Sequence, residues 1–304
     1  METKQFYVTE INRLRKERNA VILAHNYQQA EVQDIADYTG DSLGLSIMAA
    51  KTDAAVIVFC GVHFMAESAA ILSPQKTVLL PDLDAGCPLA DMAKAEDVVA
   101  KAKQIPNAVV VSYVNTTAAV KAVSDICCTS GNAVKVVKSI PQDRPILFVP
   151  DKNLGSWVEE QTGRKMVLWD GYCPTHDYIL ANEVREIKAQ YPHAMFICHP
   201  ECRPEVRQLA NKVCSTEGIV KYVKQSKSTE FIIGTEKGIL HRLQKDNPQK
   251  QFHLASNRLL CPNMKITTLS SVYRALLNLK PVITVPLEIQ VPAKRALDKM
   301  IEIV

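Results

Sequence analysis

Three stretches decide the fold: VILAHNY (21–27), VVVSYVN (109–115) and MFICHPE (195–201). Each is a short apolar run, rich in residues that favour β-strands, and each ends in polar residues. Their starts lie 88 and 86 residues apart. Because a fixed period is the signature of an internal repeat, the segments around these three runs should recur as well.

The surrounding segments keep the same order in each third of the chain. A helical segment leads into each run, at 9–19, 96–107 and 181–193, and a second helix follows it. A third helical stretch follows at 43–51, 131–139 and 218–226, then a second strand at 56–61, 146–151 and 231–236. After one more short helix, a third strand is expected at 77–82, 166–170 and 252–256.

Alternation of strands and helices predicts an α/β fold with parallel sheets. The repeat predicts three homologous units, at residues 4–91, 92–177 and 178–265. We expect the remaining residues, 266–304, to fold back onto the first unit.

Equivalent polar residues stand at the ends of the three first strands, where parallel α/β sheets bind ligands. His25, Tyr113 and His199 form one column, and Tyr27, Asn115 and Glu201 form another. A plain strand-to-loop transition would also turn polar, but Gly, Ser or Lys would serve it. Acid–base and hydrogen-bonding groups at these positions favour a functional site.

A third column consists of hydroxyls at the start of a helical stretch: Ser42, Ser130 and Thr216. Ordinary N-caps would explain them, because Ser and Thr are preferred there. A helix N-terminus also offers free N–H groups to an anion, so these positions suit carboxylates or phosphate as well.

The fourth column is a Cys-Pro pair that follows each third strand, at Cys87, Cys173 and Cys261. If the units pack around a pseudo-threefold axis, the three thiolates converge and need a cation. The alternative is three buried or loop cysteines. Zinc would recruit a fourth ligand, for which His176 is placed three residues after Cys173. An iron–sulfur cluster on three cysteines would leave one iron open.

The composition argues against several other classes of protein. The net charge of +4 is small and dispersed, which argues against nucleic-acid binding. No run of about 18 apolar residues predicts a membrane span, and the N-terminus lacks the apolar core of a signal peptide. Nine scattered cysteines look unlike a disulfide framework, so we expect a cytoplasmic protein with reduced thiols.

These residues resemble the quinolinate synthase family. The matching stretches, spread over residues 20–265, are ILAHNYQ, DIADYTGDSL, YVNTTAAVKAVSDICCTS, PDKNLG, GYCPTH, HPEC, STEG, IGTEKGILHRL and CPNM. The resemblance implies three α/β/α domains around a pseudo-threefold axis. It also implies one [4Fe–4S] cluster per chain, held by Cys87, Cys173 and Cys261, with the fourth iron open as a Lewis acid.

The implied reaction condenses iminoaspartate with dihydroxyacetone phosphate to give quinolinate, phosphate and water, and implies a functional link to L-aspartate oxidase. The family's substrate-binding positions fall on the columns, namely His25, Ser42, Tyr113, Asn115, Ser130, His199, Glu201 and Thr216. For proton transfer we expect Glu201 and Tyr27, with Tyr113 and His199 as helpers.

Two alternatives remain open, a three-cysteine zinc lyase or hydrolase that uses His176, and a non-enzymatic iron–sulfur sensor. Asp151 and Glu236 align at the ends of the second strands. They are either helix-capping acids or supports for the site.

Overall fold

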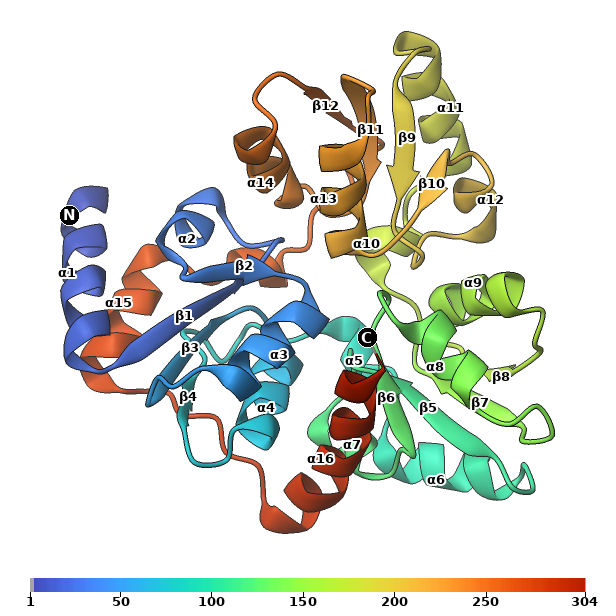
Figure 1. The fold of residues 1–304 in the computed structure, drawn as a ribbon, viewed down its shortest axis with the longest axis horizontal. Coiled ribbons are helices and arrows are strands. Elements are labelled where there is room, and N and C mark those ends of the chain that lie inside the picture. The colour runs from blue at the N-terminus through green and yellow to red at the C-terminus, as the bar shows by residue number, and fades with distance from the viewer. Residues whose placement is uncertain (1–2, 304) are drawn as a thin grey trace.

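The computed structural model describes residues 3–303 and contains three four-stranded sheets, all parallel, arranged around a common centre (Figure 1). The first sheet has the order β2 (Tyr38–Gly40), β1 (Ala20–His25), β3 (Val56–Cys60), β4 (Thr77–Leu79). The second is β6 (Ile126–Cys128), β5 (Val109–Tyr113), β7 (Ile146–Val149), β8 (Val167–Leu168). The third is β10 (Lys212–Val213), β9 (Met195–Cys198), β11 (Glu230–Gly234), β12 (Gln251–Leu254). The predicted α/β class with three repeated domains is confirmed.

Each sheet has one strand more than the sequence predicted. The additional edge strands β2, β6 and β10 contain only two or three residues, too few for an alternating pattern. A polar side chain just before each one accepts a 2.8 Å hydrogen bond from the neighbouring first strand. The three bonds run from Ile22 N to Asp37, from Val110 N to Asp125 and from Phe196 N to Asn211.

Helices cover both faces of each sheet. In the first unit these are α1 (Lys4–Glu17), α2 (Ala30–Ile35), α3 (Ser42–Lys51) and α4 (His63–Leu72). The second unit has α6 (Ala95–Lys103), α7 (Ala118–Ala122), α8 (Ala133–Ser139) and α9 (Lys152–Thr162). The third has α11 (Ala181–Gln190), α12 (Pro204–Arg207), α13 (Thr216–Gln225) and α14 (Ile239–Asp246).

Alternation along the strands divides the core. Ile22 of β1 points into a cluster with α1 and α2, whereas its neighbour Leu23 belongs to a core shared by all three units. Phe148 of β7 and Phe231 of β11 lie in the same shared core. One continuous apolar core therefore joins the three sheets and fixes how their strand ends face one another.

A basic residue before each third strand donates to the C-terminal carbonyls of a helix. Lys76 bonds the carbonyl of Thr52 after α3, Arg164 that of Ile140 after α8 at 2.7 Å, and Lys250 that of Ser226 after α13 at 2.8 Å. Cations suit this position, because the unpaired carbonyls carry partial negative charge. The same hydrogen bond therefore recurs in all three units, although the basic residue is lysine in two of them and arginine in the third.

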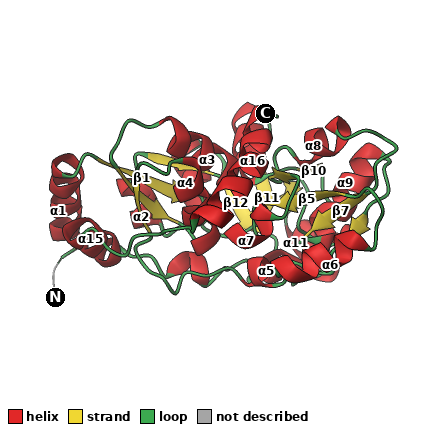
Figure 2. Ribbon diagram, turned by 90° about the horizontal axis from the view of Figure 1, so that it is seen from below, coloured by secondary structure: helices red, strands yellow, loops and turns green. Residues whose placement is uncertain are grey.

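The C-terminal segment reaches two units. Helix α15 (Leu269–Asn278) packs against α1 and β3 of the first unit. Helix α16 (Leu287–Glu302) packs against α4 of the first unit, but also against α7 and β6 of the second (Figures 1 and 2). The side chain of Asn132 donates to the carbonyls of Met300 and Ile303. The domain boundaries stay a prediction.

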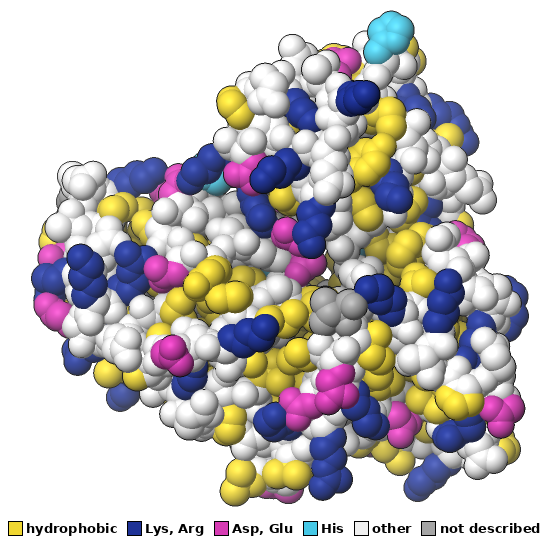
Figure 3. Space-filling view, in the orientation of Figure 1, with side chains coloured by type: hydrophobic (Ala, Val, Ile, Leu, Met, Phe, Trp, Pro, Cys, Tyr) yellow, Lys and Arg dark blue, Asp and Glu magenta, His cyan; other side chains and the backbone are white. Residues whose placement is uncertain are grey.

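Within residues 3–303, none of the helices is both long and apolar enough to cross a membrane. On the face drawn in Figure 3, basic and acidic side chains are interspersed rather than gathered by sign. This distribution agrees with the small net charge of +4.

Candidate active site

One pocket collects every residue of the four columns. Its empty space, part of which is open to solvent, is about 660 Å³ and lies where the strand ends of the three units meet. The column residues that line it are His25, Tyr27, Ser42, Cys87, Tyr113, Asn115, Ser130, Cys173, His199, Glu201, Thr216 and Cys261. Residues from three distant parts of the chain therefore share one site.

The two column histidines accept a backbone N–H through Nδ1 in the same way. Nδ1 of His25 accepts the N–H of Tyr27 at 3.2 Å, and Nδ1 of His199 accepts the N–H of Glu201 at 3.3 Å. These bonds leave the proton on Nε2, which in His199 lies 3.1 Å from Oγ of Ser130. Burial lowers the pKa of His25 to about 3, so this ring carries no charge at neutral pH; burial also lowers the pKa of His199, although the nearby Glu201 acts in the opposite direction.

The hydroxyl column does not supply the helix caps. Asp41 caps α3 and Ser215 caps α13, each accepting from a backbone N–H of the first turn. In the second unit Thr129 stands at the corresponding position. The N-cap interpretation is therefore wrong: it misses by one residue in α3 and α13, and the N-cap of α8 is Asn132. The column hydroxyls face the pocket instead: Ser42, Ser130 and Thr216.

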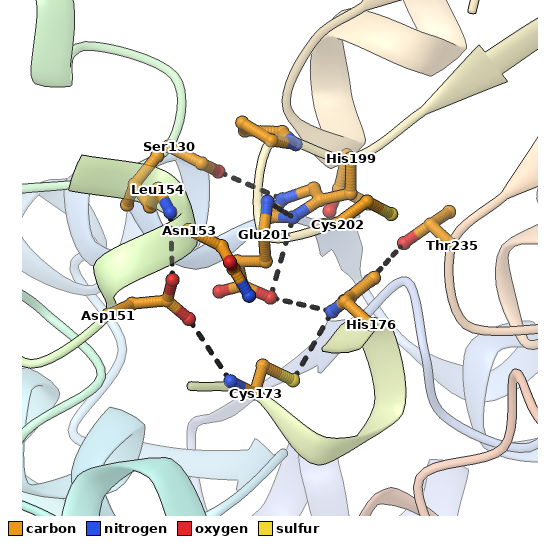
Figure 4. A network of polar contacts seen from close by, with 12 residues as sticks. Ser130, Asp151, Asn153, Leu154, Cys173, His176, His199, Glu201, Cys202 and Thr235 are labelled. Atoms are coloured by element: carbon orange, nitrogen blue, oxygen red, sulfur yellow. Dashed lines mark hydrogen bonds and ion pairs between the residues drawn. The ribbon is translucent and has the colours of Figure 1, made fainter. Parts of the chain in front are cut away.

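Glu201 is a buried carboxylate of the pocket (Figure 4). Its Oε2 lies 2.6 Å from Nδ1 of His176 and 3.4 Å from Nδ1 of His199. Burial alone would raise the pKa of Glu201, but His199 and His176 outweigh it and hold this pKa well below its usual value. Its Oε1 is buried and has no hydrogen-bond partner in the part of the chain that the structure describes. Glu201 thus offers one charged oxygen to a ligand.

The two pocket tyrosines remain protonated. Burial, followed by the negative charge of Glu201, raises the pKa of Tyr113 well above its ordinary value. Burial also raises the pKa of Tyr27, whose hydroxyl lies 3.0 Å from Oγ1 of Thr216 and 2.5 Å from Oγ1 of Thr235. Both phenols can donate a proton or a hydrogen bond.

The three column cysteines start equivalent turns. Cys87 precedes α5 (Pro88–Asp91), Cys173 precedes α10 (Pro174–Asp177), and Cys261 lies two residues before η1 (Asn263–Lys265). Burial raises the pKa of Cys87 to about 12 and also raises the pKa of Cys173 and Cys261. Such thiols stay neutral unless a cation shares the site, and three thiols lining one pocket fit an iron–sulfur cluster as ligands.

Asp151 serves both of the roles left open for it, and Glu236 serves as a support for the site. Oδ1 of Asp151 caps α9 by accepting from Leu154 N, while Oδ2 accepts from Cys173 N at 3.1 Å. Glu236 accepts from Cys261 N at 3.2 Å. Two of the three cysteine loops are therefore held by a buried carboxylate.

A second group of metal-ligand type lies in the same pocket. Ligand atoms of Cys173, His176 and Glu201 all lie within 4.8 Å of one another. His176 is thus close to Cys173, as the zinc alternative requires, with its Nδ1 at 3.2 Å from Sγ. Its Nε2, however, lies 2.8 Å from Oγ1 of Thr235.

Residues 9–302 match the family model described as Quinolinate synthetase A protein. The chain belongs to the quinolinate synthase family. It is 60% identical over 294 residues to a quinolinate synthase of Geobacter metallireducens, covering 97% of this chain and 96% of the relative. A quinolinate synthase of Methanosarcina barkeri is 53% identical over 296 residues, covering 97% of each chain. Quinolinate synthases are enzymes of NAD biosynthesis, so the predicted resemblance and the expectation of an enzyme are confirmed.

Sequence reasoning missed Thr235 and the place of His176 in the quinolinate synthase pocket. Thr235 aligns with Cys60 and Pro150 in the other units, so the repeat carried no signal for its hydroxyl. The sequence predicts His176 only as a zinc ligand. The cysteines outside the column are free thiols, and Cys60 and Cys198 are buried in strands as core residues.

Proposed function

We propose that this chain condenses iminoaspartate with dihydroxyacetone phosphate and forms quinolinate, phosphate and water. Family membership over almost the whole chain supports the activity. One observation supports assigning this activity to the column residues, namely that all four columns line a single pocket. Iminoaspartate would come from an aspartate-oxidising enzyme, and reduced thiols fit the predicted cytoplasmic location.

Substrate binding is assigned to hydroxyl, imidazole and amide groups. The hydroxyls of Ser42, Ser130 and Thr216, together with backbone N–H groups near helix starts, suit carboxylate and phosphate oxygens. His25 donates from Nε2 as a neutral ring. Oδ1 of Asn115 is buried without a hydrogen-bond partner among residues 3–303, which suits a substrate hydroxyl or amine.

Proton transfer is assigned by charge state. Glu201 is the proposed base, because His199 and His176 keep its pKa low and Oε1 is free. Tyr27 and Tyr113 hold their protons and are the proposed donors to departing hydroxyls. Base and acids at one pocket fit a reaction that removes protons from carbon and expels water.

Cys87, Cys173 and Cys261 would hold the proposed [4Fe–4S] cluster. With three protein ligands the cluster would leave one iron open, which supplies Lewis acidity toward a substrate oxygen. Backbone N–H bonds to Asp151 and Glu236 hold the loops of Cys173 and Cys261 in place beforehand.

The zinc alternative keeps one observation in its favour, the proximity of Cys173, His176 and Glu201. A zinc ion on these residues would occupy the carboxylate that the synthase reaction needs as a base. Elemental analysis of purified protein separates the two by metal identity and acid-labile sulfide.

The activity is tested by anaerobic assay of iron-replete protein with iminoaspartate and dihydroxyacetone phosphate, with quinolinate measured by chromatography. Wild type should form quinolinate with release of phosphate, and Glu201→Gln should not. Iron-replete wild type that releases no quinolinate would refute the proposal.

A further inference from the structure

Arg207 of α12 is a buried cation at the junction of the second and third units. Its side chain is 2% exposed, which arginine tolerates only when its donors are paired. Helix α12 packs against α9 of the second unit, and Figure 1 shows the two helices side by side. Both units contribute residues to the pocket, so a contact between them bears on the geometry of the site.

Toward its own unit, Arg207 holds the backbone on either side of Glu201. Its Nη1 donates to the carbonyl of Cys202 at 2.7 Å and to that of Pro200 at 3.4 Å. Because these carbonyls belong to the residues before and after Glu201, the two bonds fix the main chain that carries this carboxylate into the pocket. Arg207 does not line the pocket itself, so it acts on a substrate only through Glu201.

Toward the second unit, Arg207 binds three residues of α9. Nη1 donates to the carbonyl of Asn153 at 3.0 Å, while Nη2 donates to Oγ of Ser156 at 3.0 Å and to Oε1 of Glu160 at 2.6 Å. The planar guanidinium presents its donors in a fixed fork. The acceptors of the two units are therefore held at a set separation.

Helix α9 also sets the position of a column cysteine. Its N-cap, Asp151, accepts the N–H of Cys173 at 3.1 Å (Figure 4). Through α9, Arg207 thus connects the backbone around Glu201 to the loop of Cys173. The second unit also places Tyr113 in the pocket, so the same contact sets the distance between the proposed base and a proposed acid.

We propose that Arg207 is a positioning residue of the synthase reaction, which holds Glu201 in register with the pocket groups of the second unit. The inference rests on the proposed function, in which Glu201 is the base. A displacement of about 1 Å in a reacting group costs about 100-fold in rate. Arg207→Lys keeps the charge but places every donor on one nitrogen, so it cannot bind the carbonyls beside Glu201 and the side chains of α9 together.

The test compares Arg207→Lys with Arg164→Lys. Arg164 is also buried and also donates to backbone carbonyls, but its acceptors all lie within the second unit and outside the pocket. The same change therefore removes a buried fork in both variants, and only one of the two forks holds Glu201. Urea unfolding, iron content, quinolinate binding and steady-state kinetics are measured on iron-replete holoenzyme.

Arg207→Lys should lower kcat by roughly 10–100-fold, because Glu201 is no longer held against the second unit. KM and quinolinate binding should change less than about threefold, since the groups proposed to bind substrate stay in place. Arg164→Lys should lose stability toward urea to a similar degree and match wild type in kcat.

A second variant, Ser156→Ala/Glu160→Ala, keeps the guanidinium and removes both acceptors of Nη2. Because Glu160 is half exposed and Ser156 is only partly buried, this variant should fold and retain iron. It should lower kcat by roughly 2–10-fold, the size expected for lost hydrogen bonds, and leave KM unchanged.

An iron-replete Arg207→Lys that matches wild type in kcat would overturn the inference and leave the proposed function standing. An equal loss of kcat in Arg164→Lys would overturn it as well, because general destabilisation would then explain the defect. If Arg207→Lys does not retain iron, the double variant decides, and wild-type kcat in that variant would overturn the inference. A wild type that makes no quinolinate refutes the proposed function and the inference with it.

Discussion

Glu236→Gln should lower the free energy of unfolding by about 3–5 kcal/mol, because it breaks a buried ion pair and leaves the other charge in place. Glu236 is fully buried and lies 2.9 Å from Nζ of Lys265, which stays bonded to the carbonyl of Tyr27. The carboxylate also accepts the N–H groups of Gly238 and Cys261. The N–H of Gly238 donates to Oε2 and that of Cys261 to Oε1, and a carboxamide has an oxygen at only one of these two positions.

The matched control is Asp170→Asn, the same carboxylate-to-carboxamide change in an exposed pair. Asp170 lies 2.8 Å from Lys152, and its side chain is 90% exposed. Exposed pairs contribute about 0–1 kcal/mol, so this variant should be close to wild type.

Urea unfolding followed by circular dichroism measures both variants. Iron release to a chelator should also be faster in Glu236→Gln, because the loop of Cys261 loses a backbone hydrogen bond. If the two variants differ by less than about 0.5 kcal/mol, the ordinary spread of surface substitutions, the burial argument fails.

Four further substitutions test the site. Glu201→Gln should keep its iron, and its kcat should fall by about 10²–10⁴-fold because the proposed base is removed. Cys87→Ser should lose both its iron and its turnover, and full iron content in this variant would disprove the ligand assignment. Burial lowers the pKa of His25 from 6.5 to about 3, so the unfolded chain takes up a proton that the folded chain does not. The free energy of unfolding should therefore fall as pH drops through this range, and His25→Gln should flatten that slope in urea titrations at several pH values; an unchanged slope contradicts the assignment. A Cβ on Gly238 would lie 2.7 Å from the carbonyl of Tyr27. Gly238→Ala should therefore lower the free energy of unfolding by about 1–3 kcal/mol and weaken quinolinate binding. No change in either quantity would show that the backbone can move to accept the methyl group.

The repeat predicted which residues meet at the pocket, because equivalent chain positions reach equivalent places. Strand ends that follow the same order of elements converge on one pocket, so His25, Tyr113 and His199 could be aligned without coordinates. The capping error has a local cause. Asp41 and Ser42 are adjacent and both prefer helix starts, so composition alone does not say which one accepts the first-turn N–H.

Other features depend on contacts between units. An amphipathic helix such as α16 packs on any apolar surface of suitable shape, and its sequence does not name α7 as the partner. Thr235 and His176 are likewise joined only in three dimensions. Strands of two or three residues, such as β10, are stabilised by their neighbours and leave no periodic pattern.

The most direct test of the account is the metal content of anaerobically purified protein. If thiols from all three units hold one cluster, each chain should contain about four irons and four acid-labile sulfides. The electron-spin signal of the cluster should also change when quinolinate is added. One zinc per chain without sulfide, or an iron signal that does not change when quinolinate is added, would contradict the proposed cluster site.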